Sequence, residues 1–408
     1  MKSFYYPKEL QEIFESLCEK GIRPIIVGGF VRDFFLNFES KDIDIELYNI
    51  PSLEEVEKNL KQFGKVNSVG KSFGVVKLLY KGLDLDFSLP RVENKDAKGH
   101  KGFTITITAS LTFKEAAHRR DFTINTIGYD ILNKKILDPY NGIYDLQKRV
   151  LKAVDLQKFG EDPLRVLRAV YFTTKFDLHI QQDLFLLCQD MIDKDILNEL
   201  PKERIFEELK KILLKTQKPS KAFVLLQKIH GFSFFTEFQT ISHQKIQESL
   251  DRVDRSKKEI TLLFALLIAN FSKKEQSSFL LRITNNKTLI EKILHLNTIH
   301  FDLKVQSDYK IYKLAQKINI KYFCDYLLAY DPTKKEDIKR LQRRAEELQV
   351  LEKSLEPLVR GKDLISLGLK PSKEFSKILN LAYEKQIKNE FKTKTDAIEW
   401  IKDLIILS

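Results

Sequence analysis

Acidic residues stand at every second position of KDIDIEL, residues 41 to 47. Side chains two residues apart on an extended chain project to the same side, so Asp42, Asp44 and Glu46 would share one face of a strand. Carboxylates held this close repel each other, and Mg²⁺ would compensate them. The spacing predicts Asp42 and Asp44 as magnesium ligands and Glu46 as a surface charge, although a solvated strand face would give the same pattern.

A second acidic strand follows in FGVVKLLYKGLDLDFSL, which reads as a hairpin turning at Lys81 and Gly82. Asp84 and Asp86 alternate with apolar residues in its second arm. Asp86 is a plausible third metal ligand and Asp84 a surface charge. Three carboxylates in this arrangement fit two-metal phosphoryl transfer, in which one Mg²⁺ activates a hydroxyl and the other holds a triphosphate.

A double glycine ends the apolar strand expected at Ile25–Val27. Gly28 and Gly29 would let the backbone of a helix start approach an anion, and Arg32 one turn later could form a fork onto a phosphate. Asp33 is the expected structural partner of Arg32. Neither G-x-G-x-x-G nor a Walker sequence is present, and a simple tight turn is the alternative.

The stretch RRDFTIN, residues 119 to 125, combines charged and amide side chains. These residue types suit phosphate and ribose: Arg120 would contact a triphosphate, and Asp121 and Asn125 would bond to sugar hydroxyls. A helix start held by salt bridges is the alternative.

A third charged group lies in GEDPLRVLRAVYF, residues 160 to 172. Asp162, Arg165 and Arg168 are spaced by three and share one helix face. The Asp162 carboxylate is a hydrogen-bond acceptor and the Arg165 guanidinium a donor. Side by side they complement cytosine or adenine, whose edge offers an amino donor and a ring-nitrogen acceptor. Guanine and uracil offer a carbonyl acceptor and a ring N–H donor instead. A mismatch would leave buried polar groups unpaired, so this pair could select C or A without a template.

The elements that must position these residues change type near residue 150. Before it, strand and helix signals alternate, including a helix capped by Ser52 with Glu55 as its partner. After it, helical periodicity dominates. Helical patterns cover residues 162–176, 201–215, 220–229, 257–271 and 334–359.

Composition favours a polyanionic partner. The 408 residues carry a net charge of +12, with a pI near 9.2, although lysine-rich composition can also serve solubility alone. The three cysteines are isolated, no apolar stretch reaches the ~20 residues of a membrane span, and the start lacks a secretion signal. A cytoplasmic protein without a membrane segment is expected.

Taken together, the stretches VGGFVRD, KDIDIEL, RRDFTIN, DPYNGIYDLQKRVLKAV and FGEDPLRVLRAVYF resemble a class II tRNA nucleotidyltransferase, the CCA-adding family related to bacterial poly(A) polymerase. The resemblance implies an α+β fold with a polymerase-β-like nucleotidyltransferase head on a mixed sheet and an all-α remainder. The expected divisions are a head at 1–148, a base-selecting neck at 149–215, a body at 216–330 and a tRNA-binding tail at 331–408.

The resemblance also implies roles for single residues. Positions matching Asp42 and Asp44 bind Mg²⁺, with Asp86 as a further acid, and the position matching Asp162 pairs with Arg165 on the base edge. The incoming ATP or CTP is contacted at the positions of Gly29, Arg32, Arg120, Arg165 and Arg168.

The substrates implied are CTP, ATP and tRNA, the last bound by basic helices through backbone contacts that read shape. No phosphohydrolase domain is expected, because no His-Asp doublet occurs. The oligomeric state stays open. The alternatives are a poly(A) polymerase, a CC-only or A-only enzyme, a small-molecule nucleotidyltransferase and a non-catalytic RNA-binding protein.

Overall fold

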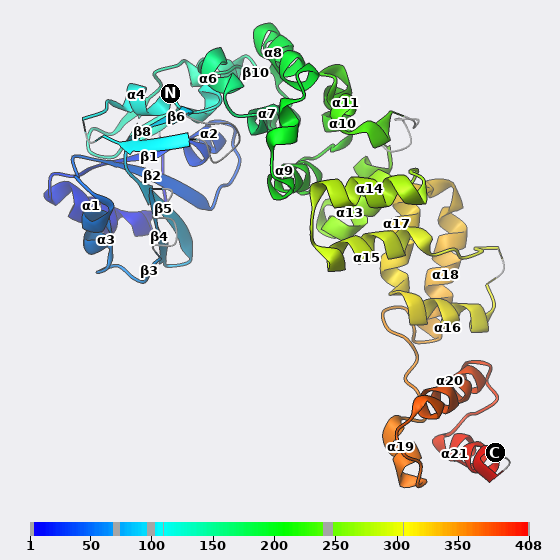
Figure 1. The fold of residues 1–408 in the computed structure, drawn as a ribbon. Helices are drawn as coiled ribbons and strands as arrows, with labels where there is room; N and C mark the ends of the chain where they lie inside the picture. Colours follow the sequence, from blue (N-terminus) through cyan, green and yellow to red (C-terminus); the bar gives the residue numbers. More distant parts are fainter. Residues whose placement is uncertain are drawn as a thin grey trace. The chain divides into compact units, whose positions relative to one another are not determined.

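The chain contains a head with a mixed sheet followed by helices, which confirms the expected fold class (Figure 1). It divides into two compact units, residues 1–241 with 278–285, and residues 242–277 with 286–408. The further division at 148, 215 and 330 stays a prediction. The computed structural model describes residues 4–67, 74–95, 103–108, 110–239, 248–304 and 306–406.

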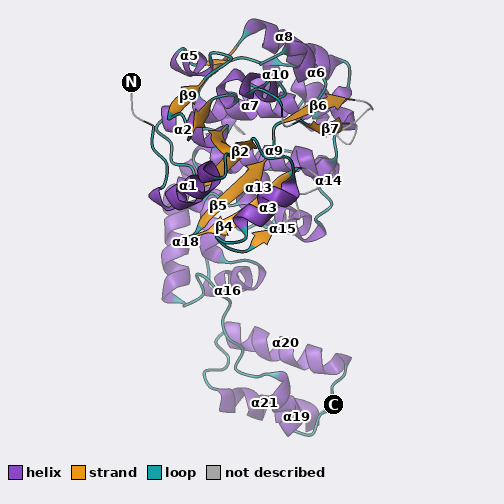
Figure 2. Ribbon diagram, turned by 90° about the vertical axis from the view of Figure 1, so that its left-hand side faces the viewer, coloured by secondary structure: helices purple, strands orange, loops and turns teal. Residues whose placement is uncertain are grey.

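The main sheet lies in the first unit, where the strands are drawn in orange in Figure 2. Its strand order is β3-β4-β5-β2-β1-β8-β9. The pair β2 and β5 is parallel, and the other neighbouring strands are antiparallel. Its strands are β1 (Arg23–Val27), β2 (Asp42–Tyr48), β3 (Val66–Asn67), β4 (Val75–Tyr80), β5 (Leu83–Ser88), β8 (Gly128–Asp130) and β9 (Lys135–Leu137). Two small sheets pair β6 (Arg91–Lys95) with β7 (Phe103–Ile107), and β10 (Val150–Leu151) with β11 (His179–Ile180).

Alternation of side chains fixes which face of β2 is buried. Ile43 and Ile45 are at most 1% exposed, whereas Asp42 and Asp44, which alternate with them, are exposed. A shift of one residue would bury the carboxylates, so this register is strongly specified. The predicted hairpin of β4 and β5 is confirmed, and its turn uses the positive φ of Lys81 and Gly82.

Three helices of the first unit pack against this sheet, α1 on β1, α2 on β1 and β2, and α3 on β4, and further helices follow along the chain. The predicted cap of α3 is present, because the Ser52 side chain accepts a hydrogen bond from the Glu55 N–H. The helices are η1 (Lys8–Leu10), α1 (Gln11–Glu19), α2 (Gly29–Phe35), α3 (Leu53–Leu60), α4 (Phe113–Ala117), η3 (Thr123–Asn125), α5 (Gly142–Gln147), α6 (Leu156–Gly160), α7 (Leu164–Phe176), α8 (Gln182–Asp193), η4 (Ile196–Glu199), α9 (Lys202–Lys215), α10 (Ser220–Lys228), α11 (Gly231–Phe234) and η5 (Thr236–Phe238).

Among the described residues, the second unit contains helices and no strand (Figure 2). In its α13, every residue from Thr261 to Ile268 is buried, and the helix packs against α15 and α17. The helices are η6 (Arg255–Lys257), α13 (Ile260–Ile268), α15 (Lys287–Thr298), α16 (Asp308–Lys317), α17 (Ile320–Tyr330), η7 (Pro332–Lys334), α18 (Lys335–Glu347), α19 (Gly361–Ser366), α20 (Lys373–Ile387) and α21 (Lys394–Ile406), while α14 (Lys273–Ile283) belongs to both units.

Helix α18 is shorter than its sequence pattern indicates. The pattern runs to residue 359, but the helix ends at Glu347. Gln349 adopts a left-handed φ of 58°, and the Val350 N–H bonds to the Ala345 carbonyl at 2.8 Å. This closure satisfies a carbonyl at the helix end and turns the chain away from the helix axis.

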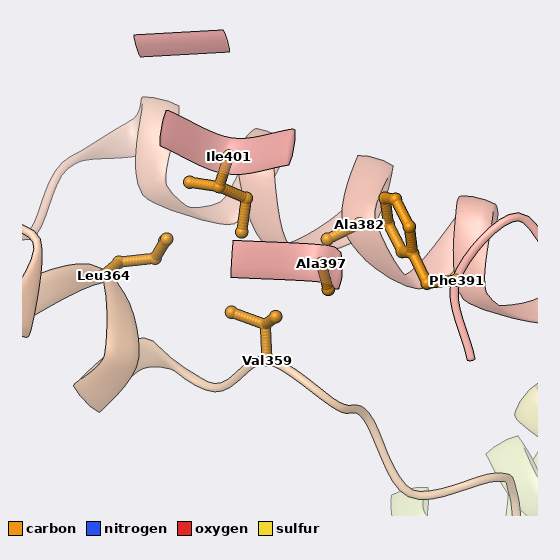
Figure 3. Close-up of a cluster of buried hydrophobic side chains, with 6 residues drawn as sticks. All are labelled: Val359, Leu364, Ala382, Phe391, Ala397 and Ile401. Atoms are coloured by element: carbon orange, nitrogen blue, oxygen red, sulfur yellow. The ribbon is translucent and has the colours of Figure 1, made fainter. Parts of the chain in front are cut away.

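The last three helices form a small apolar core of their own, made by residues of α19, α20, α21 and the segments beside them (Figure 3). Leu364 and Ile401 are fully buried there. No described helix is long and apolar enough to cross a membrane. All three cysteines are free thiols.

Candidate active site

The parallel pairing of β2 with β5 brings two acidic strands together. Asp42 lies opposite Asp84, and Asp44 lies opposite Asp86. Around Asp44 the protein removes part of the hydration, which raises the pKa of this carboxyl. Arg120 and Lys77 oppose that rise, while Asp86 and Asp42 add to it. The strands therefore concentrate negative charge, as the sequence predicted.

The Asp86 carboxylate is already paired with a lysine side chain. Lys77 on β4 donates to both of its carboxylate oxygens, at 2.8 and 2.7 Å. Among the described residues, no group of three or more His, Cys, Asp or Glu side chains is arranged to hold a metal ion. The predicted pair Asp42 and Asp44 offers oxygen ligands of the kind that Mg²⁺ prefers, with a negative charge that a cation would neutralise. The role of Asp86 as a third acid stays a prediction.

Glu46 was predicted to be a surface charge from its place in the alternating strand, but it is buried. It is 1% exposed, and it accepts hydrogen bonds from the Tyr48 hydroxyl at 2.7 Å and from Arg119 Nη2 at 3.3 Å. A buried carboxylate needs such partners, and Arg119 lies 73 residues away in the sequence. Asp84, which was also predicted to be a surface charge, is exposed.

The double glycine ends β1 and starts α2, as predicted. Gly28 has a φ of 68°, and a Cβ atom there would lie 2.8 Å from Arg120 Nη1 and 3.8 Å from Asp44 Oδ2. The absence of a side chain therefore lets Arg120 and Asp44 approach the turn. Arg120 Nη1 donates to the Asn125 carbonyl at 2.8 Å, and burial lowers the pKa of Arg120.

A chain of polar contacts joins α2 to α7. Arg32 donates to Asp33 at 2.6 and 2.8 Å, which confirms their predicted partnership, and to Asn125 Oδ1 at 2.5 Å. Asn125 in turn donates to Asp121 at 2.8 Å, and Arg168 on α7 closes the chain with an ion pair to Asp121 at 2.6 Å. Four residues predicted to contact a nucleotide therefore also bond to one another.

Burial and neighbouring charges have opposite effects on the pKa values of Asp121 and Arg168. Burial would raise the pKa of Asp121, but the charge of Arg168 and the hydrogen bond from Asn125 outweigh it, so the pKa is lowered. Burial would lower the pKa of Arg168, but Asp121 and Glu208 raise it overall. Phe172 was not predicted to take part; the centre of its ring lies 5.0 Å from the Arg32 guanidinium and 5.2 Å from that of Arg168.

The predicted base-reading pair lies at the start of α7. Asp162 Oδ1 accepts from the N–H of Leu164, the first residue of the helix, at 3.1 Å. Arg165 donates to two backbone carbonyls, those of Arg119 at 2.7 Å and Lys158 at 3.1 Å. These two bonds use a part of the five N–H groups of a guanidinium, so Arg165 retains donors for a ligand.

A single cavity of about 840 Å³ in the first unit collects most of these residues. Ten of the twelve predicted site residues line it; Asp42 and Asp86 do not. Helix α9, which was not predicted to take part, forms a wall of the cavity through residues on one of its faces. The full lining comprises Val27, Gly28, Gly29, Arg32, Asp44, Val75, Ser88, Arg91, Arg119, Arg120, Asp121, Asn125, Asp162, Leu164, Arg165, Arg168, Phe172, Glu203, Arg204, Glu207, Glu208 and Lys211.

Comparison with known families matches two parts of the chain. Residues 25–152 match the family described as "Poly A polymerase head domain". Residues 177–239 match the one described as "Probable RNA and SrmB- binding site of polymerase A". The first match covers all of the main sheet except the first two residues of β1, together with the double glycine and both acidic strands.

Curated relatives include CCA-adding enzymes. The enzyme of Buchnera aphidicola subsp. Schizaphis graminum is 30% identical over 363 residues, which cover 76% of this chain and 84% of that protein. The enzyme of Lactococcus lactis subsp. cremoris (strain MG1363) is 29% identical, with coverage of 98% and 97%.

Solved structures share the fold over nearly the whole length. The Bacillus stearothermophilus CCA-adding enzyme in complex with CTP superposes with a TM-score of 0.77 at 20% identity, covering 98% of this chain and 99% of that one. The Thermotoga maritima CCA-adding enzyme complexed with tRNA gives 0.63 at 21% identity, with coverage of 98% and 96%.

Proposed function

This chain belongs to the family of CCA-adding enzymes, the tRNA nucleotidyltransferases, and we propose that it adds C, C and A to the 3′ end of tRNA from CTP and ATP. The observation that carries the proposal is the shared cavity. Asp44 and the Gly28 turn line the same space as Asp162 and Arg165. A nucleoside triphosphate needs a charged site for its phosphates and a hydrogen-bonding site for its base, and this cavity offers both.

The triphosphate would bind beside the double glycine. Arg120 lies against Gly28 and supplies a positive charge there, and backbone N–H groups at the start of α2 supply further donors. Asp42 and Asp44 would hold Mg²⁺. When bound, the two ions would activate the attacking hydroxyl and stabilise negative charge on the triphosphate.

The transfer step would join the tRNA 3′-oxygen to the α-phosphorus. The bond from that phosphorus to the oxygen bridging the β-phosphate breaks, the hydroxyl proton passes to solvent, and pyrophosphate leaves. Arg32, Asp121, Asn125 and Arg168 would hold the nucleotide side of the cavity in one geometry through their mutual bonds.

Base choice would rest on Asp162 and Arg165. Asp162 would accept from the amino group of cytosine or adenine, and Arg165 would donate to the adjacent ring nitrogen. Guanine and uracil would place a carbonyl oxygen against the Asp162 carboxylate and an N–H against the Arg165 guanidinium, and buried unpaired groups cost about 1–3 kcal/mol each.

The basic helices are proposed to bind the tRNA backbone. Arg204 and Lys211 of α9 line the cavity. In the second unit, Arg344 is held by Asp308 at 2.7 Å, so part of its charge is already compensated. A cytoplasmic location is part of the proposal.

The direct test is a denaturing gel of one tRNA transcript ending at its discriminator base, incubated with Mg²⁺ and CTP, ATP or both. Growth by two nucleotides with CTP and by three with both is expected. The match of the head to a poly(A) polymerase family makes that activity the second candidate. Long ladders with ATP alone would establish it, a single productive nucleotide would indicate a CC-only or A-only enzyme, and no extension would favour an RNA-binding protein.

The carboxylate assignment has a matched pair of variants. Asp42→Ala should abolish extension while retaining tRNA binding in a filter assay. Asp84→Asn changes the exposed carboxylate that lies opposite Asp42 in the neighbouring strand, and this variant should retain extension. Extension by Asp42→Ala at the wild-type rate would contradict the assignment.

A further inference from the structure

Glu208 on α9 is a buried carboxylate in the wall of the cavity. It is 2% exposed. Oε1 accepts from Lys211 Nζ at 2.8 Å, whereas Oε2 has no hydrogen-bond partner among the described residues. A buried carboxylate with one unsatisfied oxygen is costly, so its retention needs an explanation.

The neighbours of Glu208 on α7 do not supply the missing donor. Helices α7 and α9 pack against each other, and the charge of Glu208 contributes to raising the pKa of Arg168. Arg168 directs Nε and Nη2 to Asp121, at 2.7 and 2.6 Å. Glu208 lines the cavity from a helix that packs against α7, which carries Arg165 and begins two residues after Asp162.

We infer that Glu208 is a further specificity-determining residue, which accepts an N–H of the exocyclic amino group of the base bound in the cavity. This inference rests on the proposed function. The amino groups of cytosine and adenine each carry two N–H bonds, and Asp162 uses only one of them. Guanine and uracil carry a carbonyl oxygen at the same place, whose lone pairs a carboxylate repels.

The variant Glu208→Gln tests this role, because it preserves the shape and removes the charge. Its amide can turn either an oxygen or an NH₂ group to the base. We expect kcat/KM for CTP and ATP to fall about tenfold, and the preference for CTP over UTP and for ATP over GTP to fall by at least tenfold. If Glu208 only supports α9 and Arg168, the variant would lower the transfer of all four nucleotides by the same factor.

A matched control is available in Glu237. It is 5% exposed, its Oε1 accepts from Arg282 at 2.9 Å, and its Oε2 has no hydrogen-bond partner among the described residues, yet it does not line the cavity. Glu237→Gln removes a comparable buried charge and should leave the CTP to UTP ratio at the wild-type value.

An altered substrate tests the same contact in the unchanged protein. N4-methyl-CTP retains one N–H on its amino group, so one of the two carboxylates must lose its donor. Wild-type enzyme should use it at least tenfold less well than CTP, and Glu208→Gln should show a smaller difference. Equal use of both by the wild type, or equal losses for all four nucleotides in Glu208→Gln, would overturn the inference. Failure of the wild type to extend tRNA with CTP and ATP would instead overturn the proposed function.

Discussion

Asp121 and Arg168 lie 47 residues apart in the sequence and form an ion pair of 2.6 Å between the head and helix α7. The Asp121 side chain is 7% exposed and that of Arg168 is 30% exposed. Both residues were predicted to contact a nucleotide. Because the two side chains also bond to each other, removing either one affects the cavity wall as well as any ligand.

Asp121→Ala should lower the free energy of unfolding by about 2–3 kcal/mol. This is less than the roughly 3–5 kcal/mol typical of a fully buried pair, because Arg168 is partly exposed. Urea unfolding of Asp121→Ala, Arg168→Met and the double variant would give a coupling free energy of about 1–3 kcal/mol. A coupling near zero would mean that the two side chains do not depend on each other.

Lys77→Met should strengthen metal binding. Lys77 holds both oxygens of Asp86, so a cation that uses Asp86 must compete with it. The Lys77 side chain is 56% exposed, and exposed ion pairs contribute about 0–1 kcal/mol, which limits the gain to about fivefold. Titration with Mn²⁺ followed by electron paramagnetic resonance measures it. An unchanged dissociation constant would argue against Asp86 as a third ligand.

Much of the fold could be predicted from local patterns. The alternation in β2, the turn at Lys81 and Gly82 and the Ser52 cap each depend on residues close in sequence, and each is confirmed. The end of α18 could not be predicted in this way. Its polar and apolar periodicity continues past Glu347, and the closing bond at Ala345 depends on a single left-handed residue.

The site shows the same limit more sharply. Its residue types were predicted, and most of those residues do line one cavity. Their partners were not, because Glu46 meets Arg119 across 73 residues and Asp121 meets Arg168 across 47. The position of a carboxylate along a strand tells which face of the strand its side chain lies on. Whether that face is buried depends on elements far along the chain.

Asp130→Asn should show a pH-dependent loss of stability. Burial would raise the pKa of Asp130, but hydrogen bonds from Arg23 and Asn133 lower it below the ordinary value of 3.8. The stabilisation from ionised Asp130 is therefore present above pH 3.8 and lost as pH falls through the lower folded-state pKa. The variant should be less stable by about 1–3 kcal/mol at pH 7, and the difference should shrink below about pH 4.

Chemical unfolding of the wild type and Asp130→Asn between pH 3 and 8 tests this sign. Asp190→Asn, which breaks an exposed pair with Lys194, is the control and should change the free energy of unfolding by about 0.5 kcal/mol or less. A difference between wild type and Asp130→Asn that grows toward acid would contradict the assigned direction.

Gly28→Ala should impair nucleotide binding as well as folding. Its backbone, with φ of 68° and ψ of −122°, is strained for any residue with a side chain, at a cost of about 1–3 kcal/mol. The added Cβ would also meet Arg120 Nη1 at 2.8 Å and displace it from its bond to the Asn125 carbonyl. If Arg120 binds the triphosphate, KM should rise about tenfold for CTP and ATP alike, because both share that group.

Gly21→Ala separates the two effects. Gly21 has a φ of 77°, and a Cβ there would meet nothing within 4 Å, so the variant has backbone strain without a collision. It should lose about 1 kcal/mol of stability and retain the wild-type KM. Thermal unfolding and initial rates of both variants give the comparison. If Gly28→Ala loses stability but retains the wild-type KM, then Arg120 is not a triphosphate contact, and its approach to Gly28 serves only the packing of the turn.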